Sequence, residues 1–245
     1  MSDLILTTEK DGVFTITLNR TSKKNALTNV MYQQLCQHFS YAEKTSSVHC
    51  LVIQGDEHCF CAGNDLHDFI LCSAADELAA LEFVQTLAQF TKPLIAGVAG
   101  VAVGIGTTLL LHCDMVIAAN NSQFQLPFTQ LGLCPEAGSS LLLTQKIGQN
   151  KAFELMVLGK SFNAEQALNF GIINQICRPN ELMSLTKEIA QTIAKLPVDA
   201  VMTSRKLIRQ GNQLALKQTI SAESQAFFQL VNSPACKKIL KGFFK

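Results

Sequence analysis

The amino-acid sequence predicts an α/β protein with a largely parallel sheet, followed by a mostly helical C-terminal part. In the N-terminal half, a pattern of strand, loop and helix occurs three times, which is typical of a parallel sheet rather than a sandwich. Beyond residue 139, apolar residues recur mainly at helical spacing. A chain of 245 residues is long enough to bury a full hydrophobic core.

The N-terminal half begins with a predicted β-hairpin. Two alternating apolar runs, 4–8 and 13–18, are joined at Asp11-Gly12, a dipeptide that favours tight hairpin turns. A capping residue, Thr28 or Asn29, then begins a helix that runs to about residue 43. The further elements predicted here are a strand at 50–54, a polar loop at 55–65, a helix at 76–90, a strand at 94–98, a glycine loop at 100–106, a short helix at 107–112 and a strand at 114–118.

The C-terminal part is predicted to be helical except for a strand at 172–176. No low-complexity linker divides the chain. We therefore expect residues 1–195 to form the ligand-binding, catalytic core and residues 196–245 to form a helical region. The predicted helices cover 139–147, 151–158, 164–170, 181–195, 198–210 and 213–231.

The composition restricts the possible partners. Charged residues are only 16% of the chain and hydrophobic residues 48%, so we expect other copies of the chain to cover apolar surface. The net charge is +1 with scattered Lys and Arg, which does not suggest binding to nucleic acid. Nine cysteines without framework spacing, and no signal-like segment at the start, favour a reduced protein of the bacterial cytoplasm.

Two further classes of function are disfavoured. His58-Cys59-Phe60-Cys61 is the best candidate for a metal site, but no second Cys/His pair at zinc spacing accompanies it. Residues 94–111 carry no charge and are long enough to span a membrane. They contain four glycines and many β-branched residues, so a strand, a glycine loop and a helix are the better interpretation. We expect neither a metal nor a membrane partner.

The segment between Lys92 and Lys146 contains only two formal charges, Asp114 and Glu136. A carboxylate in apolar surroundings is either paired or used to transfer protons, because burying an unpaired charge is costly. For Glu136, which follows Pro135, one alternative is a first-turn residue that complements a helix dipole. For Asp114, at the start of a strand, we expect a structural hydrogen-bonding role.

Two glycine-containing loops each follow a strand, at 60–66 and 100–107. Small residues let a backbone approach a ligand, and free amides at a helix start can bind an oxyanion or a phosphate. Neither loop matches a dinucleotide or Walker-type fingerprint. From spacing alone, a tight turn with close helix–sheet contact remains an equal alternative.

Taken together, the motifs of this chain resemble the crotonase (enoyl-CoA hydratase/isomerase) superfamily along nearly its whole length. The motifs are Lys23-Lys24-Asn25-Ala26-Leu27, Phe60-Cys61-Ala62-Gly63-Asn64-Asp65-Leu66, Lys92-Pro93-Leu94-Ile95-Ala96-Gly97-Val98-Ala99-Gly100 with Ala102 and Gly104, Cys113-Asp114 with Ile117-Ala118, and Gly159-Lys160 with Phe162, Ala164, Ala167 and Gly171-Ile172-Ile173.

The resemblance implies a spiral core of ββα units with a C-terminal trimerisation region, and an acyl-CoA thioester as substrate. It further implies a homotrimer or a dimer of trimers, and no cofactor apart from the coenzyme A that is part of the substrate. It places two oxyanion-binding backbone amides at Asn64 and Ile105. The positions that it assigns to substrate binding are Lys24, Ala26, Ala62, Gly63, Asp65, Leu66, Gly104, Gly106, Phe128 and Pro135.

The residues at the catalytic positions distinguish between reactions within this family. Hydratases use two glutamates, and the corresponding positions here are Thr108 and Phe128, neither of which can ionise. Glu136 lies eight residues beyond Phe128, where it resembles the lone glutamate of the peroxisomal type of Δ3,Δ2-enoyl-CoA isomerase. Such an enzyme moves one proton from carbon 2 to carbon 4 with a single carboxyl.

Two alternatives to this isomerase remain at the level of sequence. One is a hydratase or another enolate reaction of the same family. The other is a non-catalytic acyl-CoA-binding protein, against which the presence of Glu136 counts. We expect the neighbouring Asp65 to cap or brace its loop.

Overall fold

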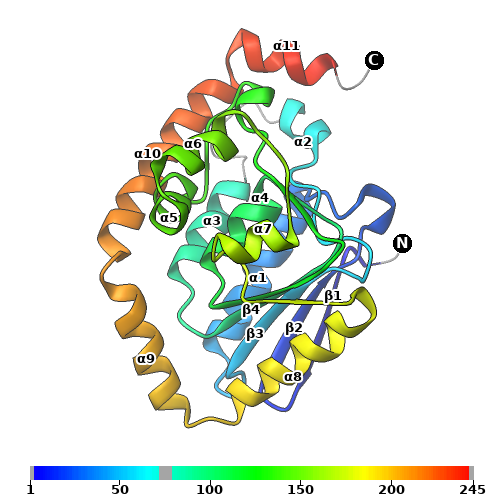
Figure 1. Ribbon diagram of the computed structural model, residues 1–245, viewed down its shortest axis with the longest axis vertical. Coiled ribbons are helices and arrows are strands. Elements are labelled where there is room, and N and C mark those ends of the chain that lie inside the picture. The colour runs from blue at the N-terminus through cyan, green and yellow to red at the C-terminus, as the bar shows by residue number, and fades with distance from the viewer. Residues whose placement is uncertain (1–2, 72–78, 243–245) are drawn as a thin grey trace.

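A six-stranded sheet forms the base of the computed structural model, which describes residues 3–71 and 79–242. The strand order is β1-β2-β3-β4-β6-β9, and all neighbours are parallel except β1 and β2 (Figure 1). The predicted α/β class with a largely parallel sheet is therefore confirmed. The six strands are β1 Ile5–Lys10, β2 Val13–Leu18, β3 Cys50–Gln54, β4 Leu94–Val98, β6 Met115–Ala119 and β9 Gln175–Cys177.

The predicted N-terminal hairpin is also confirmed. Lys10 pairs with Val13, and the two residues between them, Asp11 and Gly12, have φ angles of 53° and 77°. Positive φ at both central residues matches the right-handed twist of the flanking strands. At the other end of the hairpin, Ile5 pairs with Leu18.

A second, three-stranded sheet was not foreseen from the sequence. It has the order β5-β7-β8 and consists of β5 Val101–Val103, β7 Gln123–Gln125 and β8 Phe162–Asn163. Strands of two or three residues are too short for an alternating pattern to reveal them. Part of the predicted glycine loop at 100–106 is therefore a strand.

The helix expected at 107–112 begins earlier than predicted. Helix α4 covers Ile105–Thr108 and continues as a 3-10 turn, η3, over Leu109–His112. Gly104, with a φ of 54°, ends the extended backbone and serves as the residue before the helix. Because glycine adopts this conformation without a steric penalty, the chain can turn from strand into helix within one residue.

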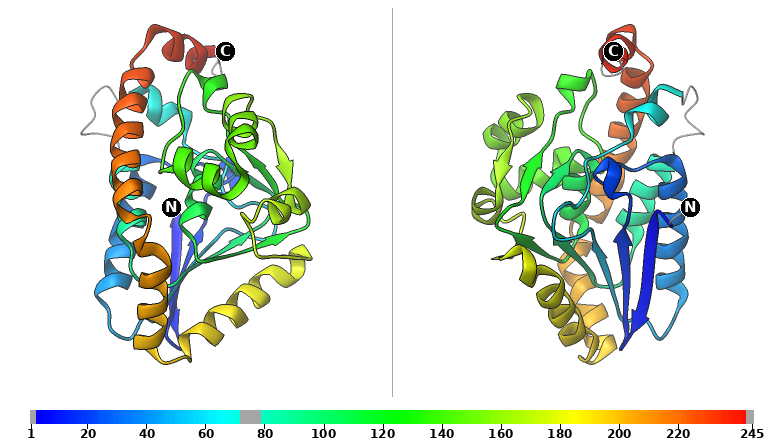
Figure 2. Two further views of the ribbon diagram at one scale, coloured as in Figure 1. Left: turned by 60° about the vertical axis from the view of Figure 1, so that its left-hand side comes forward. Right: turned by 90° about the vertical axis from the view of Figure 1, so that its right-hand side faces the viewer.

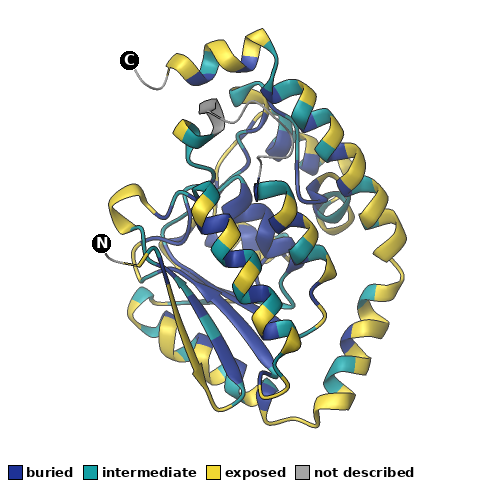
Figure 3. Cartoon of the chain, turned by 180° about the vertical axis from the view of Figure 1, so that it is seen from behind, coloured by how far each residue is buried: buried dark blue, intermediate teal, exposed yellow. Residues whose placement is uncertain are grey.

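Helices cover both faces of the large sheet. Helices α1 (Asn29–Lys44) and α3 (Ala79–Gln89) pack together over one face, and α8 (Leu182–Ala194) lies across the other. The central strands β3, β4 and β6 are buried, whereas the edge strand β1 and the outer faces of the helices are largely exposed (Figure 3). Thr28 caps α1 by accepting a hydrogen bond from the Met31 amide, as expected. The first residues of the helix predicted at 76–90 lie outside the described residues.

The remaining helices build the upper part and one side of the molecule (Figures 1 and 2). Helix α9 runs along the side, and α10 continues from it to pack against α3 and α5. The strand predicted at 172–176 is wrong in position, because Ile172 and Ile173 are buried in the turn before β9. These helices are α2 Leu66–Leu71, α5 Ser139–Ile147, α6 Gln149–Val157, α7 Ala164–Asn169, α9 Val198–Gln210, α10 Gln213–Val231 and α11 Pro234–Gly242, the last of which was not predicted.

Candidate active site

A single parallel β-bridge joins the two glycine-containing loops, and a second one joins the first loop to the 23–27 segment. Cys61 pairs with Ala102, and Leu27 pairs with Asn64. The N–H and the C=O of Cys61 each form a 2.9 Å hydrogen bond with the backbone of the second loop. The two predicted glycine loops therefore lie side by side and act as one unit.

Glycines permit this close approach. A Cβ atom at Gly63 would lie 2.9 Å from the carbonyl oxygen of Val103, and one at Gly106 would lie 2.5 Å from that of Cys61. Real Cβ atoms do not tolerate such contacts with backbone. The glycines thus set the separation of the loops that carry the two predicted amides.

The N–H groups of Asn64 and Ile105, the two amides that the sequence singled out, donate no hydrogen bond to another described residue. Ile105 is the first residue of α4, so its amide has no partner within the helix. Backbone amides at a helix start are suited to stabilise an oxyanion.

Glu136 is buried near these loops. Only 8% of it is exposed, and its Oε1 accepts a 2.5 Å hydrogen bond from the hydroxyl of Thr108 on α4. Burial raises the pKa of the Glu136 carboxyl to about 8; the Thr108 hydrogen bond opposes this rise and the negative charge of Glu223 adds to it. At neutral pH this side chain is therefore mainly an uncharged acid, and it can both accept and return a proton near pH 8.

A small cavity brings Glu136 and Asn64 together. Its volume is about 20 Å³. Glu136 is the one carboxyl group among its described lining residues, and the other polar groups are an amide and a phenol. The described residues that line it are Tyr32, Asn64, Ala80, Leu81, Val84, Glu136 and Phe227.

The residues around Asn64 hold it in place. The Tyr32 hydroxyl donates a hydrogen bond to the Asn64 side chain. Asp65 forms a 2.7 Å ion pair with Arg20 and accepts a 3.0 Å hydrogen bond from the His67 amide. Asp65 therefore braces its loop and caps α2, as expected.

The other predicted binding residues divide into two groups. The Lys24 carbonyl accepts a 2.9 Å hydrogen bond from the Ala62 amide, so the 23–27 segment lies directly beside the first loop. The Ala26 carbonyl is bound by Arg20, and Leu66 begins α2. Phe128 is buried and Pro135 half-buried, but neither is among the described residues that line the cavity.

Sequence reasoning missed several residues of this site. Tyr32 has the spacing of a core aromatic on α1, and Phe227 that of a core residue on α10. The sequence identified Thr108 only as a residue that cannot ionise at a glutamate position of the hydratases. In the structure its hydroxyl donates a hydrogen bond to Glu136. Glu223 on α10 is buried and close enough to influence Glu136. In the sequence, nothing distinguishes it from a solvated helix residue.

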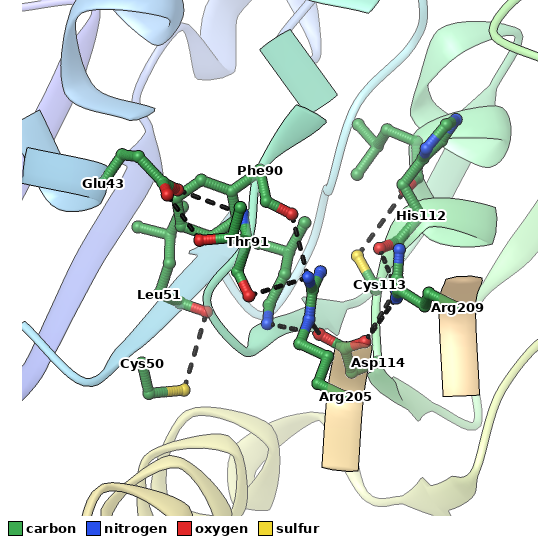
Figure 4. A network of polar contacts seen from close by, with 12 residues as sticks. Glu43, Cys50, Leu51, Phe90, Thr91, His112, Cys113, Asp114, Arg205 and Arg209 are labelled. Atoms are coloured by element: carbon green, nitrogen blue, oxygen red, sulfur yellow. Dashed lines mark hydrogen bonds and ion pairs between the residues drawn. The ribbon is translucent and has the colours of Figure 1, made fainter. Parts of the chain in front are cut away.

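Asp114 has the structural role that the sequence suggested (Figure 4). Its carboxylate accepts the Leu94 amide at 2.8 Å and pairs with Arg205 and Arg209, both at 2.7 Å. Arg209 also donates to the carbonyl of His112. This network ties α9 to the start of β4 and to the turn after α4.

Neither a metal centre nor a membrane segment is found in residues 3–71 and 79–242. No group of three or more His, Cys, Asp or Glu side chains there could hold a metal ion. Cys59 and Cys61, the candidate ligands, are free thiols. None of the helices in this part of the chain has the length and apolar character required to cross a bilayer.

A family model described as "Enoyl-CoA hydratase/isomerase" matches residues 8–245. The 2,3-dehydroadipyl-CoA hydratase of Escherichia coli K12 is 32% identical over 93% of this chain and 89% of that protein. The enoyl-CoA delta isomerase 2 of Rattus norvegicus is 37% identical over 85% of this chain and 55% of that protein. The structure of OdaA from Pseudomonas aeruginosa superposes with a TM-score of 0.94 and 37% identity, covering 99% of both chains.

Proposed function

The chain belongs to the enoyl-CoA hydratase/isomerase family, as the motifs indicated, and we propose that it acts as a Δ3,Δ2-enoyl-CoA isomerase. The observation that carries the proposal is the single buried carboxyl at the cavity. Glu136 lies beside Asn64, and its pKa of about 8 lets one group serve as base and then as acid. The relatives include both hydratases and isomerases, so the argument for isomerisation rests on the site.

The proposed reaction is a 1,3-proton shift without loss or gain of atoms. The Glu136 carboxylate removes a proton from carbon 2 of a 3-enoyl thioester, and the electron pair of that C–H bond enters a dienolate. The amides of Asn64 and Ile105 stabilise the negative thioester oxygen. Protonated Glu136 then delivers the proton to carbon 4, which leaves the double bond between carbons 2 and 3.

Hydration is the second candidate, because several relatives bear hydratase names. A hydratase of this family would position water with two glutamates, whereas Thr108 and Phe128 occupy those places. Thr108 directs its hydroxyl proton to Glu136. This leaves one carboxyl for proton transfer, which is sufficient for isomerisation.

The oxyanion site supplies much of the proposed rate enhancement. The two amides are already oriented before charge develops on the thioester oxygen, so they need no reorganisation in the transition state. The loss of one such donor typically costs roughly 3–4 kcal/mol of transition-state stabilisation.

The cavity beside Glu136 has a volume of only about 20 Å³. This space is much smaller than an acyl chain, so we expect the walls from α3 and α10 to adjust when substrate binds.

We also propose an acyl-CoA substrate, no additional cofactor, and a homotrimer or dimer of trimers in the bacterial cytoplasm. Exposed apolar side chains after residue 195 support an assembly, because Ile208 is 83% and Leu214 71% exposed. The free cysteines support a reducing compartment. Light scattering of Ile208→Asp tests the assembly: the variant should dissociate, and an unchanged mass would remove this support.

The isomerase is tested with a 3-enoyl-CoA and with crotonyl-CoA. We expect the wild type to conjugate the double bond of the first and not to hydrate the second. Glu136→Gln should abolish isomerisation but retain acyl-CoA binding, measured by calorimetry. Exposed Glu188 provides a matched control, and Glu188→Gln should remain active. An active Glu136→Gln enzyme would exclude the mechanism, and hydration without isomerisation would favour the hydratase.

A further inference from the structure

One peptide unit next to Glu136 is held at both of its ends by buried ionisable side chains. The carbonyl of Ala137 lies 2.7 Å from Nε2 of His112, and the amide of Gly138 donates a 2.6 Å hydrogen bond to Glu223. These two groups belong to the same peptide bond. His112 comes from the turn after α4 and Glu223 from α10, so the peptide is clamped from two sides.

The clamped peptide lies in an unusual backbone conformation. Ala137 has a φ of 57° and Gly138 a φ of 71°. A residue with a Cβ rarely adopts this left-handed region, which persists only where the surroundings enforce it. The turn connects Glu136 to α5 and thereby determines the direction of the Glu136 side chain.

The neutral His112 ring carries its proton on Nε2, so that this nitrogen can donate a hydrogen bond to the Ala137 carbonyl throughout the physiological pH range. Burial lowers the pKa of His112 to about 4, so the imidazole is neutral at physiological pH. A carbonyl oxygen can only accept, and the single ring proton therefore resides on Nε2. Arg209 binds the backbone carbonyl of the same residue, which links this end of the clamp to the Asp114 network.

Glu223 performs a second task at the start of α5. Its other oxygen accepts hydrogen bonds from the amide and the hydroxyl of Ser140, at 2.9 and 2.5 Å. Burial raises the pKa of Glu223 above its usual value, and the hydrogen bonds from Ser140 and Gly138 oppose this rise because they favour the ionised carboxylate. Since Glu223 occupies the positive end of the helix, that end is not available to stabilise the Glu136 anion.

Few other groups that can titrate face Glu136 among the described residues. Tyr32 approaches from α1, Cys134 lies on the same loop, and Glu223 approaches from α10. The residues of α3 at the cavity are apolar. The charge of Glu223 is therefore the dominant electrostatic neighbour, and Thr108 is the direct hydrogen-bond partner.

We propose that His112 and Glu223 are positioning residues which clamp the Ala137–Gly138 peptide and so hold the Glu136 carboxyl against Thr108. This inference rests on the proposed function of Glu136 and adds the device that aims it. Neither residue is among the described residues that line the cavity beside Glu136. Both act through the backbone of the turn.

The His112 half of the clamp is tested with two replacements of similar size. His112→Met removes the donor, whereas His112→Gln retains an N–H group at a comparable reach. Misplacement of a catalytic group by about 1 Å can cost roughly 100-fold, so we expect His112→Met to lower kcat about 10- to 100-fold with little change in KM. His112→Gln should recover most of this loss. Equal losses in both variants would overturn the role.

The Glu223 half is tested by comparing Glu223→Met, which removes both acceptor oxygens, with Glu223→Gln, which keeps one. Both variants remove the neighbouring negative charge, but only Glu223→Met should release the peptide and with it the Thr108 hydrogen bond, so the midpoint of Glu136 titration should be about 1 pH unit higher in Glu223→Met than in Glu223→Gln. The midpoint is measured by ¹³C NMR of labelled glutamate, with Glu136→Gln used for assignment. Equal midpoints in the two folded Glu223 variants would overturn this half; if Glu223→Met does not fold, the two His112 variants decide.

The NMR titration keeps two failures apart. If the wild type does not isomerise 3-enoyl-CoA, the proposed function fails, but the midpoint of Glu136 still reports on the clamp without any substrate. If the wild type is active, the midpoint and kcat are unchanged in His112→Met, and both quantities are the same in Glu223→Met as in Glu223→Gln, the clamp fails and the proposed function stands.

Discussion

The hydrogen bond between Thr108 and Glu136 limits the rise of the Glu136 pKa, so its loss should slow the proposed reaction at neutral pH. Thr108→Val removes the hydroxyl but keeps the branched shape of the side chain. The 2.5 Å bond stabilises the ionised carboxylate and so lowers the pKa of Glu136, which burial has raised to about 8. Its removal should therefore raise this pKa further.

The size of the effect follows from the bond and the pKa. A hydrogen bond to a charged group contributes about 1.5–3 kcal/mol, equivalent to a pKa change of roughly 1–2 units. With a pKa of about 8, roughly one tenth of Glu136 is ionised at pH 7. A one-unit rise lowers this to about one hundredth, so kcat/KM at pH 7 should fall about 10-fold.

The assay is the pH profile of kcat/KM for a 3-enoyl-CoA between pH 6 and 9.5. For a one-unit shift, the defect of Thr108→Val should shrink to within about twofold near pH 9.5, because both enzymes are then largely ionised. Thr108→Ser retains a hydroxyl and should return the midpoint toward that of the wild type. A defect of equal size at every pH would refute the reasoning.

Three further predictions concern stability and loop geometry. In the folded protein the pKa of Glu136 is about 8, whereas the pKa of a glutamate in the unfolded chain is about 4.5, so stability falls as the pH rises between these two values. Glu136→Gln should thus gain roughly 3 kcal/mol more unfolding free energy at pH 8 than at pH 5 in urea titrations; equal gains would contradict a buried acid. Asp114→Asn leaves a buried guanidinium without its partner and should cost about 3 kcal/mol, against under about 0.5 kcal/mol for exposed Asp199→Asn; similar losses would argue against the network. Gly106→Ala would bring a Cβ within 2.5 Å of the Cys61 carbonyl and should lower kcat about 10- to 100-fold. Circular dichroism should show an intact fold, and an unchanged kcat would speak against the oxyanion site.

Long periodic elements and strong local signals could be predicted from the sequence. The Asp11-Gly12 hairpin, the Thr28 cap and the long helices were found because their signals are local. Strands β7 and β8 are held by backbone pairing with distant segments. Their side-chain pattern is too short to reveal them.

The site shows the same division between local and distant information. Glu136 was recognised because a carboxyl in an apolar segment is conspicuous by itself. Tyr32 and Glu223 acquire their roles only through partners that lie 32 and 85 residues away. Such roles depend on tertiary contacts, and the residue types alone do not reveal them.

The position of α10 late in the chain has a consequence for biosynthesis. Phe227 and Glu223 enclose Glu136 from that helix, but the ribosome produces Glu136 long before either of them. Until α10 docks, the carboxyl is open to water on this side, so the burial that raises its pKa is incomplete. The surroundings of Glu136 are therefore completed only after α10 has been made, and a protease that removed α10 would expose the carboxyl without cutting the loop that carries it.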